Sequence, residues 1–336
     1  MAIPKTILIC GATGTQGSST VKALLASPRL PSDAKILALT RSPSSPKAQA
    51  LAALDPRVQL LAGEPTVPEA IFAAAPAHID AVYNVTVHGP PGYEESQTQP
   101  LFDACVAHNV SHFVFASADR GGEVLSETNP SPAPHIAAKF RIEKYIKANA
   151  QGTNTAWTFL RPVTFFENMS NDFNGKSFAA MWHNVGKKPV QMVATSDIGF
   201  FVATVILAPD EWAGKALGIA GDELNYDQGR KIFKETMGFE MPHALNIMGT
   251  LAKKFMGDIG AMFQWFEKEG FNVDIEKARR INPNLQTFAQ WLVNDSQFEK
   301  VEKVEKLEKT NSATKQCTCG HSWCSKCKHQ AEAVGA

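Results

Sequence analysis

The 336-residue sequence has little of several features that would assign a protein class at once. Its net charge is zero, from 33 basic and 33 acidic residues, so no overall field attracts nucleic acid or an acidic membrane surface. The N-terminus lacks the pattern of a signal peptide, and the longest apolar run, residues 199–209, is too short to span a bilayer. We expect a soluble cytoplasmic protein that binds neither membranes nor nucleic acid directly.

Cysteine is also scarce, with six residues in the whole chain. Cys10 and Cys105 stand singly in apolar segments, and the other four crowd the C-terminal tail: Cys317, Cys319, Cys324 and Cys327. This is not the even spread of a disulfide-stapled secreted fold. Four thiolates suit a tetrahedral Zn²⁺ site, which would be structural or regulatory. The alternative is that these are redox-reactive or unstructured tail cysteines.

What the sequence has is a regular alternation of short β-rich runs and helical patterns in its first half. The strand candidates are Thr6–Cys10, Lys35–Thr40, Val58–Ala62, Ala81–Val87, His112–Ala116 and Ala156–Leu160. Strands that alternate with helices at this pace indicate βαβ units and a parallel sheet. We therefore predict a Rossmann-type α/β domain, with a doubly wound parallel sheet, over residues 1–165.

After residue 165 the pattern changes to that of a smaller, mainly helical C-terminal lobe, predicted over residues 166–298. Residues 181–217 indicate irregular pieces around one helix, whereas residues 225–239 and 247–270 have helical patterns. A final helix is expected within residues 282–297, capped by an Asn or Asp residue.

The last segment, residues 299–336, joins a charged extension to the cysteine-rich tail. Residues 299–309 repeat Glu and Lys at i,i+4 spacing, in the order that stabilises a helix. This pattern is typical of a solvated helical extension.

Three glycines follow the first strand candidate at the spacing Gly11-x-x-Gly14-x-x-Gly17. Gly11 permits a tight turn, Gly14 lets the backbone approach a pyrophosphate, and Gly17 lets the next helix pack close to the strand. The helix N-terminus then offers N–H groups to the phosphates. We predict a nucleotide site at Gly11, Ala12, Thr13, Gly14, Thr15, Gln16 and Gly17; a merely structural glycine turn is the alternative.

Arg41 selects between the two nicotinamide dinucleotides. An NAD site usually places an acidic residue at the end of the second strand, where this sequence has Arg41 followed by Ser42, Ser44 and Ser45. A guanidinium there can pair with a 2′-phosphate through two hydrogen bonds. The pattern favours NADP(H), and the alternative is that Arg41 is an ordinary surface charge.

On these residues, together with "HIAAKFRIEKYI" and "LRPVTFFENM", the chain resembles the NmrA-like family of atypical short-chain dehydrogenases/reductases. The resemblance runs from about residue 5 to residue 298, and "GATGTQG" and "FFEN" are its most specific signatures. It implies a doubly wound nucleotide domain, a small C-terminal lobe, and NADP(H) in the cleft between them. The family includes reductases of secondary metabolism and nucleotide-sensing regulators without evident catalysis.

The resemblance also locates candidate catalytic residues. Members of the wider superfamily use Tyr-x-x-x-Lys, where this chain has His135-x-x-x-Lys139. Lys139 can hold the nicotinamide ribose, and His135 can serve as an acid near neutral pH. A helix-surface Lys and a structural His are the alternatives.

Further cofactor-side candidates follow the strand ends, where parallel sheets bind ligands. Thr86 and Ser117 come after the fourth and fifth strands, and Ser117 can also hydrogen-bond a substrate carbonyl. By resemblance, the segment after the sixth strand touches the nicotinamide side, and its residues are Pro162, Val163, Thr164 and Phe165. Phe165 and Phe166 would then shape the pocket, unless both are core residues. Asn84 and Asn168 are weaker candidates.

The second lobe is rich in large apolar side chains, including Met262, Phe263, Trp265 and Phe266. Core packing is their first interpretation; as a pocket wall they would select an apolar or aromatic substrate. The first functional hypothesis is an NADP(H)-dependent oxidoreductase acting on a small organic molecule. The second is a non-catalytic NADP(H) sensor with a regulatory protein partner.

Overall fold

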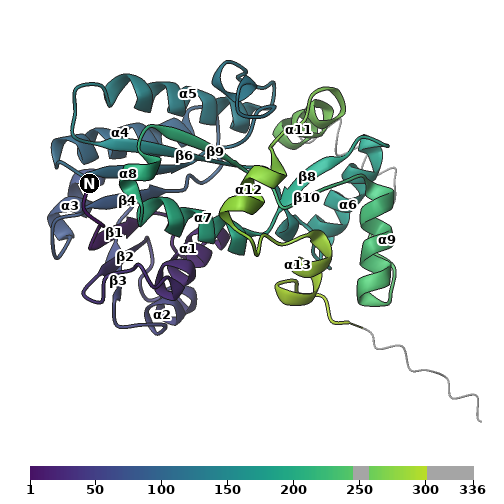
Figure 1. The fold of residues 1–336 in the computed structure, drawn as a ribbon, viewed down its shortest axis with the longest axis horizontal. Helices are drawn as coiled ribbons and strands as arrows, with labels where there is room; N and C mark the ends of the chain where they lie inside the picture. The colour runs from purple at the N-terminus through teal and green to yellow at the C-terminus, as the bar shows by residue number, and fades with distance from the viewer. Residues whose placement is uncertain (245–256, 301–336) are drawn as a thin grey trace, which may run out of the picture. The chain divides into compact units, whose positions relative to one another are not determined.

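A seven-stranded parallel sheet forms the centre of the larger part of the fold (Figure 1). The computed structural model describes residues 1–244 and 257–300. The strand order is β3-β2-β1-β4-β5-β6-β9, and all neighbouring pairs are parallel. The strands are β1 (Thr6–Ile9), β2 (Lys35–Thr40), β3 (Val58–Ala62), β4 (Ala81–Asn84), β5 (His112–Ala116), β6 (Ala156–Pro162) and β9 (Lys215–Ile219). The order reverses between β1 and β4, a point at which open sheets bind ligands beyond their carboxyl ends.

Successive residues of β1 face opposite helix layers. Ile7 and Ile9 pack in the core shared with α1 and α7, whereas Leu8 and Cys10 pack in the core shared with α4 and α5. Figure 1 shows these two helix layers on either side of the sheet. Because strand side chains alternate and both layers are apolar, a central strand is apolar on both faces, as Ile7, Leu8 and Ile9 are. The helices of the layers are α1 (Thr15–Ala26), α2 (Pro46–Ala52), α3 (Pro68–Ala74), α4 (Tyr93–Ala107), α5 (Pro134–Asn149), α7 (Thr195–Ile206) and α8 (Pro209–Trp212).

A smaller lobe surrounds a three-stranded sheet and an aromatic core. In the order β10-β8-β7, the first pair is antiparallel and the second is parallel. Phe166 contacts Phe288 and Trp291 with ring centroids 5.4 and 5.5 Å away, so the final helix is fixed to the segment that follows β6. The elements are β7 (Thr164–Phe165), β8 (Val190–Val193), β10 (Asp222–Leu224), α6 (Phe173–Val185), α9 (Tyr226–Met237), α11 (Gly257–Lys268), α12 (Ile275–Ile281) and α13 (Phe288–Asn294), with short 3₁₀ turns at Leu125–Glu127 and Phe166–Asn168.

Segments after residue 165 also return to the larger sheet. Helix α7 packs against α1, and β9 pairs with β6 so that Ile219 lies opposite Pro162. All described elements belong to one compact unit, Met1–Val301. The division at residue 165 stays a prediction, and the chain crosses it to complete the sheet.

The predicted fold class is confirmed. The strands over residues 35–40, 58–62 and 112–116 have the predicted bounds, and β6 continues two residues beyond Leu160. The prediction for residues 181–217 was incomplete, because this segment contains β8, α8 and β9 as well as α7. Strands of four and five residues are too short to show a clear periodicity in the sequence.

Two helix caps show how local sequence sets the ends of the lobe's helices. Asn225 caps α9 in a capping box with Gln228. The predicted Asn or Asp cap of the final helix was wrong, since Thr287 caps α13 in a capping box with Gln290. Helix α11 confirms the later part of the predicted helix over 247–270.

Several predictions fall on residues outside the described ranges. These are the earlier part of the 247–270 helix, nearly all of the 299–309 repeat and the four tail cysteines. Among the described residues, no helix is both long enough and apolar enough to cross a membrane.

Asp197, in the first turn of α7, links that helix to the segment between α12 and α13. Its carboxylate accepts hydrogen bonds from Asn282 Nδ2 at 2.9 Å and from the backbone N–H of Gln286 at 3.0 Å. Burial raises the pKa of Asp197 to about 6, although these two hydrogen bonds oppose the change. Between about pH 4 and pH 6, Asp197 therefore keeps its proton in the folded state and loses it in the unfolded chain.

The free energy of unfolding should reflect that proton. Since the native pKa lies above the unfolded value, Asp197 costs the native state progressively more as pH rises from about 4 to about 6, up to roughly 3 kcal/mol. Urea unfolding of the wild type and Asp197→Asn across this range should show the variant gaining relative stability as pH rises. Glu235→Gln, at an exposed carboxylate on α9, is the control. Its free energy of unfolding should change with pH in the same way as that of the wild type. A constant difference between wild type and Asp197→Asn would contradict the assignment.

Candidate functional site

The glycine turn between β1 and α1 has a geometry that only glycine fits. Gly11 has φ = +66°, and its carbonyl accepts the N–H of Gly14 at 2.9 Å. A Cβ on Gly17 would lie 2.2 Å from Gly11 O and 2.7 Å from Ala12 Cα, both backbone atoms. Gly14 is the N-cap of α1 and supplies no side-chain cap, so the first N–H groups of the helix remain available to an anion.

Arg41 lies directly after β2, beside this turn. Ile9 is in register with Ala38, so β1 and β2 end at the same edge of the sheet. Arg41 is exposed, and within residues 1–244 and 257–300 no group forms a hydrogen bond or ion pair with it. Ser45 instead caps α2, by accepting the N–H of Ala48 at 3.4 Å. The guanidinium is thus placed to meet a phosphate near the turn.

A cavity of about 770 Å³ extends from the first turn of α1 into the smaller lobe. Gln16 connects it to the glycine turn, and the Tyr83 hydroxyl donates a hydrogen bond to Gln16 Oε1 at 3.2 Å. The cavity brings together these predicted residues: Gln16, Thr86, Ser117, His135, Lys139, Pro162, Val163, Thr164 and Phe165. The other predicted residues do not line it: Gly11, Ala12, Thr13, Gly14, Thr15, Gly17 and Arg41. The predicted site therefore divides into two parts: the glycine turn with Arg41, here called the phosphate end after its predicted ligand, and the residues that line the cavity, the cavity end.

Lys139 has two partners at the cavity wall. Its ammonium donates to the Thr86 hydroxyl and forms an ion pair with Glu94 Oε2 at 2.8 Å. Thr86 in turn donates to Glu94 Oε2 at 2.6 Å. Burial alone would raise the pKa of Glu94. The charge and hydrogen bond of Lys139, together with hydrogen bonds from Thr86 and His88, outweigh burial and hold this pKa below its usual value.

His135 stands in the first turn of α5, half-buried, and faces a second histidine. The His88 ring contacts it edge-on, with centroids 5.6 Å apart. His88 Nδ1 also lies 3.5 Å from Glu94 Oε1. His135, His88 and Glu94 line both the large cavity and a smaller one of about 200 Å³, so these side chains form the wall between the two.

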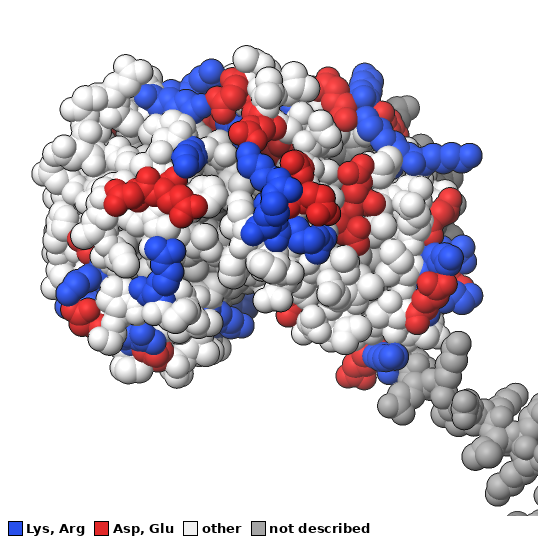
Figure 2. Space-filling view, in the orientation of Figure 1, with Lys and Arg blue, Asp and Glu red and all other residues white. Residues whose placement is uncertain are grey.

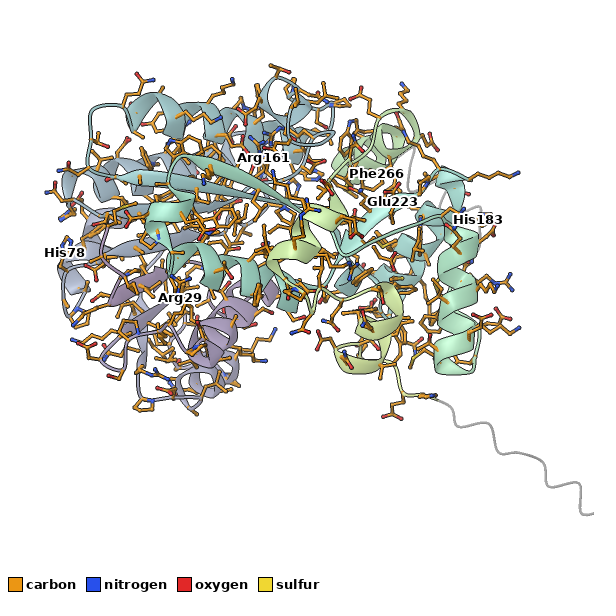
Figure 3. The ribbon with its side chains drawn as sticks, in the orientation of Figure 1. Arg29, His78, Arg161, His183, Glu223 and Phe266 are labelled. Atoms are coloured by element: carbon orange, nitrogen blue, oxygen red, sulfur yellow. The ribbon has the colours of Figure 1, made fainter. Side chains whose placement is uncertain are left out.

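Ser117 is buried, and its hydroxyl is already engaged. It donates a hydrogen bond to Glu143 Oε1. Glu143 Oε2 also accepts hydrogen bonds from the Nη2 atoms of Arg120 and Arg161, each at 2.7 Å. Both guanidiniums are almost fully buried, and Figure 3 labels Arg161 at the end of β6 nearer the smaller lobe. A hydroxyl has one proton, so Ser117 could donate a hydrogen bond to a substrate carbonyl only if its hydrogen bond to Glu143 broke. Its assignment to the cofactor or substrate stays a prediction.

The "FFEN" signature splits between the cavity and the core. Phe165 lines the cavity, whereas Phe166 is fully buried against α13. Asn168 is exposed and lines the cavity. Thr164 Oγ1 is buried at the wall and has no hydrogen-bond partner among the described residues. Asn84 donates to Thr98 Oγ1 at 2.9 Å, a contact between β4 and α4 outside the cavity.

The aromatic segment of α11 also divides. Met262 and Phe263 line the cavity, whereas Trp265 and Phe266 pack in the lobe's core, where Figure 3 labels Phe266. The apolar wall of the cavity includes Phe165, Phe178, Met181, Met262, Phe263 and Phe271. An apolar or aromatic molecule would be complementary to this wall.

Sequence reasoning missed the residues that hold the predicted ones in place. On α5, His135, Lys139 and Glu143 follow at intervals of four, which places them on one face of the helix. That spacing would have drawn attention to Glu143. No comparable signal marks Glu94 or His88. Glu94 contacts Lys139, and His88 contacts Glu94 and His135, only after three segments of the chain have packed together.

Neither the surface charge nor the grouping of potential metal ligands points to a further site among the described residues. The face shown in Figure 2 carries acidic and basic side chains next to one another, as a net charge of zero allows. Within the described ranges, no three His, Cys, Asp or Glu side chains are grouped so that they could hold a metal ion. The zinc prediction concerns cysteines outside those ranges and stays untested.

The chain belongs to the NmrA-like family, whose family model matches residues 4–292. It is 26% identical over 261 residues to the NmrA-like family domain-containing oxidoreductase hkm9 of Aspergillus hancockii, covering 70% of this chain and 74% of that protein. The resemblance inferred from the sequence motifs is thereby confirmed.

Solved structures share the fold at low sequence identity. A triphenylmethane reductase of Citrobacter sp., complexed with NADP(H), is similar with a TM-score of 0.66 and 19% identity, over 85% of this chain and 98% of that one. NmrA, a negative transcriptional regulator in complex with NADP, is similar with a TM-score of 0.61 and 17% identity, over 86% and 94%. These similarities establish the fold of this chain.

Proposed function

We propose that this chain is an NADP(H)-dependent oxidoreductase that reduces a small apolar or aromatic carbonyl or unsaturated compound. The observation that carries the proposal is the cavity, which joins Lys139 and His135 to an apolar wall and reaches the glycine turn through Gln16. The NADP(H) in the solved triphenylmethane reductase supports the same cofactor for this fold.

The residues at the phosphate end fit the cofactor. Gly17 lets α1 pack directly against the turn, since a Cβ there would overlap the backbone of Gly11 and Ala12. The N-terminus of α1 carries no side-chain cap and supplies N–H donors for a pyrophosphate. Arg41 provides a guanidinium with no competing partner among the described residues, which suits the 2′-phosphate.

At the cavity end, a bound NADPH supplies a hydride, and the chain has to position it and provide a proton. Lys139 and Thr86 hold the ribose through their remaining hydrogen-bonding capacity. His135 donates a proton to the oxygen of a reduced carbonyl, in the place where the wider superfamily has tyrosine. The phenylalanine and methionine wall keeps water from the reacting atoms.

A second candidate is a non-catalytic NADP(H) sensor. It is favoured by Ser117, whose proton is committed to Glu143, together with the absence of tyrosine at position 135. Similarity to the NmrA regulator points in the same direction. Such a sensor would need different affinities for NADPH and NADP⁺, since a ligand shifts a conformational equilibrium only through differential binding.

A panel of aldehydes, ketones and quinones, assayed by NADPH consumption, tests the enzyme hypothesis. Turnover of at least one compound is expected, and His135→Phe should lower kcat about 100-fold with NADPH affinity retained, because it removes the proton donor. His108→Phe, at a partly exposed histidine on the far end of α4, is the matched control and should keep wild-type kcat.

Two results would count against this proposal. Full turnover by His135→Phe would show that His135 does not donate the proton. NADPH binding without turnover of any compound, with a partner protein captured in one redox state alone, would favour the sensor.

A further inference from the structure

Glu94 is a buried carboxylate that the proposed chemistry does not use. Its side chain is 5% exposed, and it lies in the first turn of α4, at the cavity wall. One oxygen meets Lys139 and Thr86, and the other faces His88. A charged group is buried at a cavity wall only where its partners offset the loss of water, so this arrangement is costly to remove.

The partners of Lys139 and Thr86 do not use the full hydrogen-bonding capacity of these two side chains. A lysine ammonium has three donors, and Lys139 uses one on Thr86 and one on Glu94. The single hydroxyl proton of Thr86 goes to the same carboxylate. One donor of Lys139 and one lone pair of Thr86 therefore remain for a ligand in the cavity.

The surroundings of Glu94 are set by three segments. They are the first turn of α4, the face of α5 and the loop after β4. The titratable and charged groups nearest to it are Lys139, His88, His135, Glu95 and Arg141, of which the last two pair with each other at 2.6 Å. Glu94 is the group that links the cavity lysine to the wall between the two cavities.

We propose that Glu94 is a positioning residue, which fixes the Lys139 ammonium at the height of the nicotinamide ribose. The inference deepens the proposed function and rests on it, since it needs the cofactor in this cavity. With Glu94 and Thr86 as fixed partners, the Lys139 ammonium has one donor left, which suits the holding of a ligand in place. Glu94 then strengthens cofactor binding in the enzyme and in the sensor alike.

The test compares two ligands by isothermal titration calorimetry. NADPH carries the nicotinamide ribose, whereas adenosine 2′,5′-bisphosphate carries the adenosine and 2′-phosphate without it. Glu94→Gln and Lys139→Met are each expected to weaken NADPH binding about tenfold. The double variant should be within about twofold of Lys139→Met, because both changes remove the same interaction. Affinity for the bisphosphate should be unchanged in all three.

Glu95→Gln is the matched control, since it neutralises the adjacent carboxylate on the same helix. It should bind both ligands as the wild type does. Glu94→Asp, which keeps the negative charge but draws the carboxylate away from Lys139, keeps the proposal testable if Glu94→Gln does not fold. It should weaken NADPH binding and leave bisphosphate binding unchanged.

Three results would overturn the inference: wild-type NADPH affinity in Glu94→Gln, additive losses in the double variant, or an equal loss for the bisphosphate. The proposed function fails separately, if the wild type itself binds neither ligand, and the inference then fails with it.

Discussion

Arg41→Gln is expected to weaken NADPH binding roughly 30- to 100-fold while NADH binding stays within about twofold. The guanidinium is exposed beside the glycine turn, and its donors are not used by any described residue. A 2′-phosphate would take two of them in a charge-assisted pair, which is among the stronger hydrogen-bonded contacts. NADH has a hydroxyl at that position and gains little from the arginine.

Calorimetric titration of wild type and Arg41→Gln with both dinucleotides checks this selectivity. Lys47→Gln is the control, because it removes an exposed charge from the neighbouring helix α2 without altering the position after β2. Raising the salt concentration should weaken NADPH binding to the wild type more than to Arg41→Gln. Parallel losses for NADPH and NADH would show that Arg41 does not read the 2′-phosphate.

Gly17→Ala should abolish dinucleotide binding and lower the free energy of unfolding by about 3 kcal/mol. The new Cβ would meet Gly11 O at 2.2 Å and Ala12 Cα at 2.7 Å. Both are backbone atoms of the turn, so no flexible side chain can move aside. Either α1 shifts away from β1 or the turn deforms, and both changes disturb the N–H groups that face the phosphates.

Urea unfolding and NADPH titration of Gly17→Ala measure the two effects separately. Ser18→Ala is the control: it adds no atoms at the next position of α1, and its stability should lie within about 0.5 kcal/mol of the wild type. A Gly17→Ala protein that folds with normal stability and binds NADPH would contradict the close packing described for this turn.

The glycine turn and the position of Arg41 could be predicted because the information for both is local. Gly11, Gly14 and Gly17 are tied to one turn by their spacing, and Arg41 is placed by the end of a strand whose bounds were predicted correctly. Three predicted strands match in full, and β2 and β5 are the two of them whose apolar runs mark buried parallel strands. The family resemblance then connected this turn to the segment after β6.

The cavity end could be predicted only in part, because its details depend on packing between distant segments. The sequence singled out Lys139 and Thr86, but not that both would share Glu94, which reaches them from another helix. It grouped Phe165 with Phe166, although the two side chains face the cavity and the core respectively. The commitment of Ser117 to Glu143 depends on how α5 packs against β5 and β6, which no local pattern reports.

Short elements were the other source of error. Strand β8 and the start of β9 lie in a segment predicted to be irregular around one helix, and β9 completes the large sheet from beyond residue 165. The cap of α13 was assigned to the wrong residue type because Asn and Asp occur nearby, whereas Thr287 and Gln290 have the capping-box spacing. Element type is therefore more predictable here than strand order or helix ends.

Titration of the wild-type chain with NADP⁺ and NAD⁺ in a thermal-unfolding experiment tests the central claim most directly. A ligand at about 100 times its Kd adds roughly 2.7 kcal/mol to the free energy of unfolding. NADP⁺ should therefore raise the melting temperature by several degrees and do so at a much lower concentration than NAD⁺. A melting temperature that NADP⁺ leaves unchanged, or that both dinucleotides raise equally, would contradict the site built on the glycine turn and Arg41.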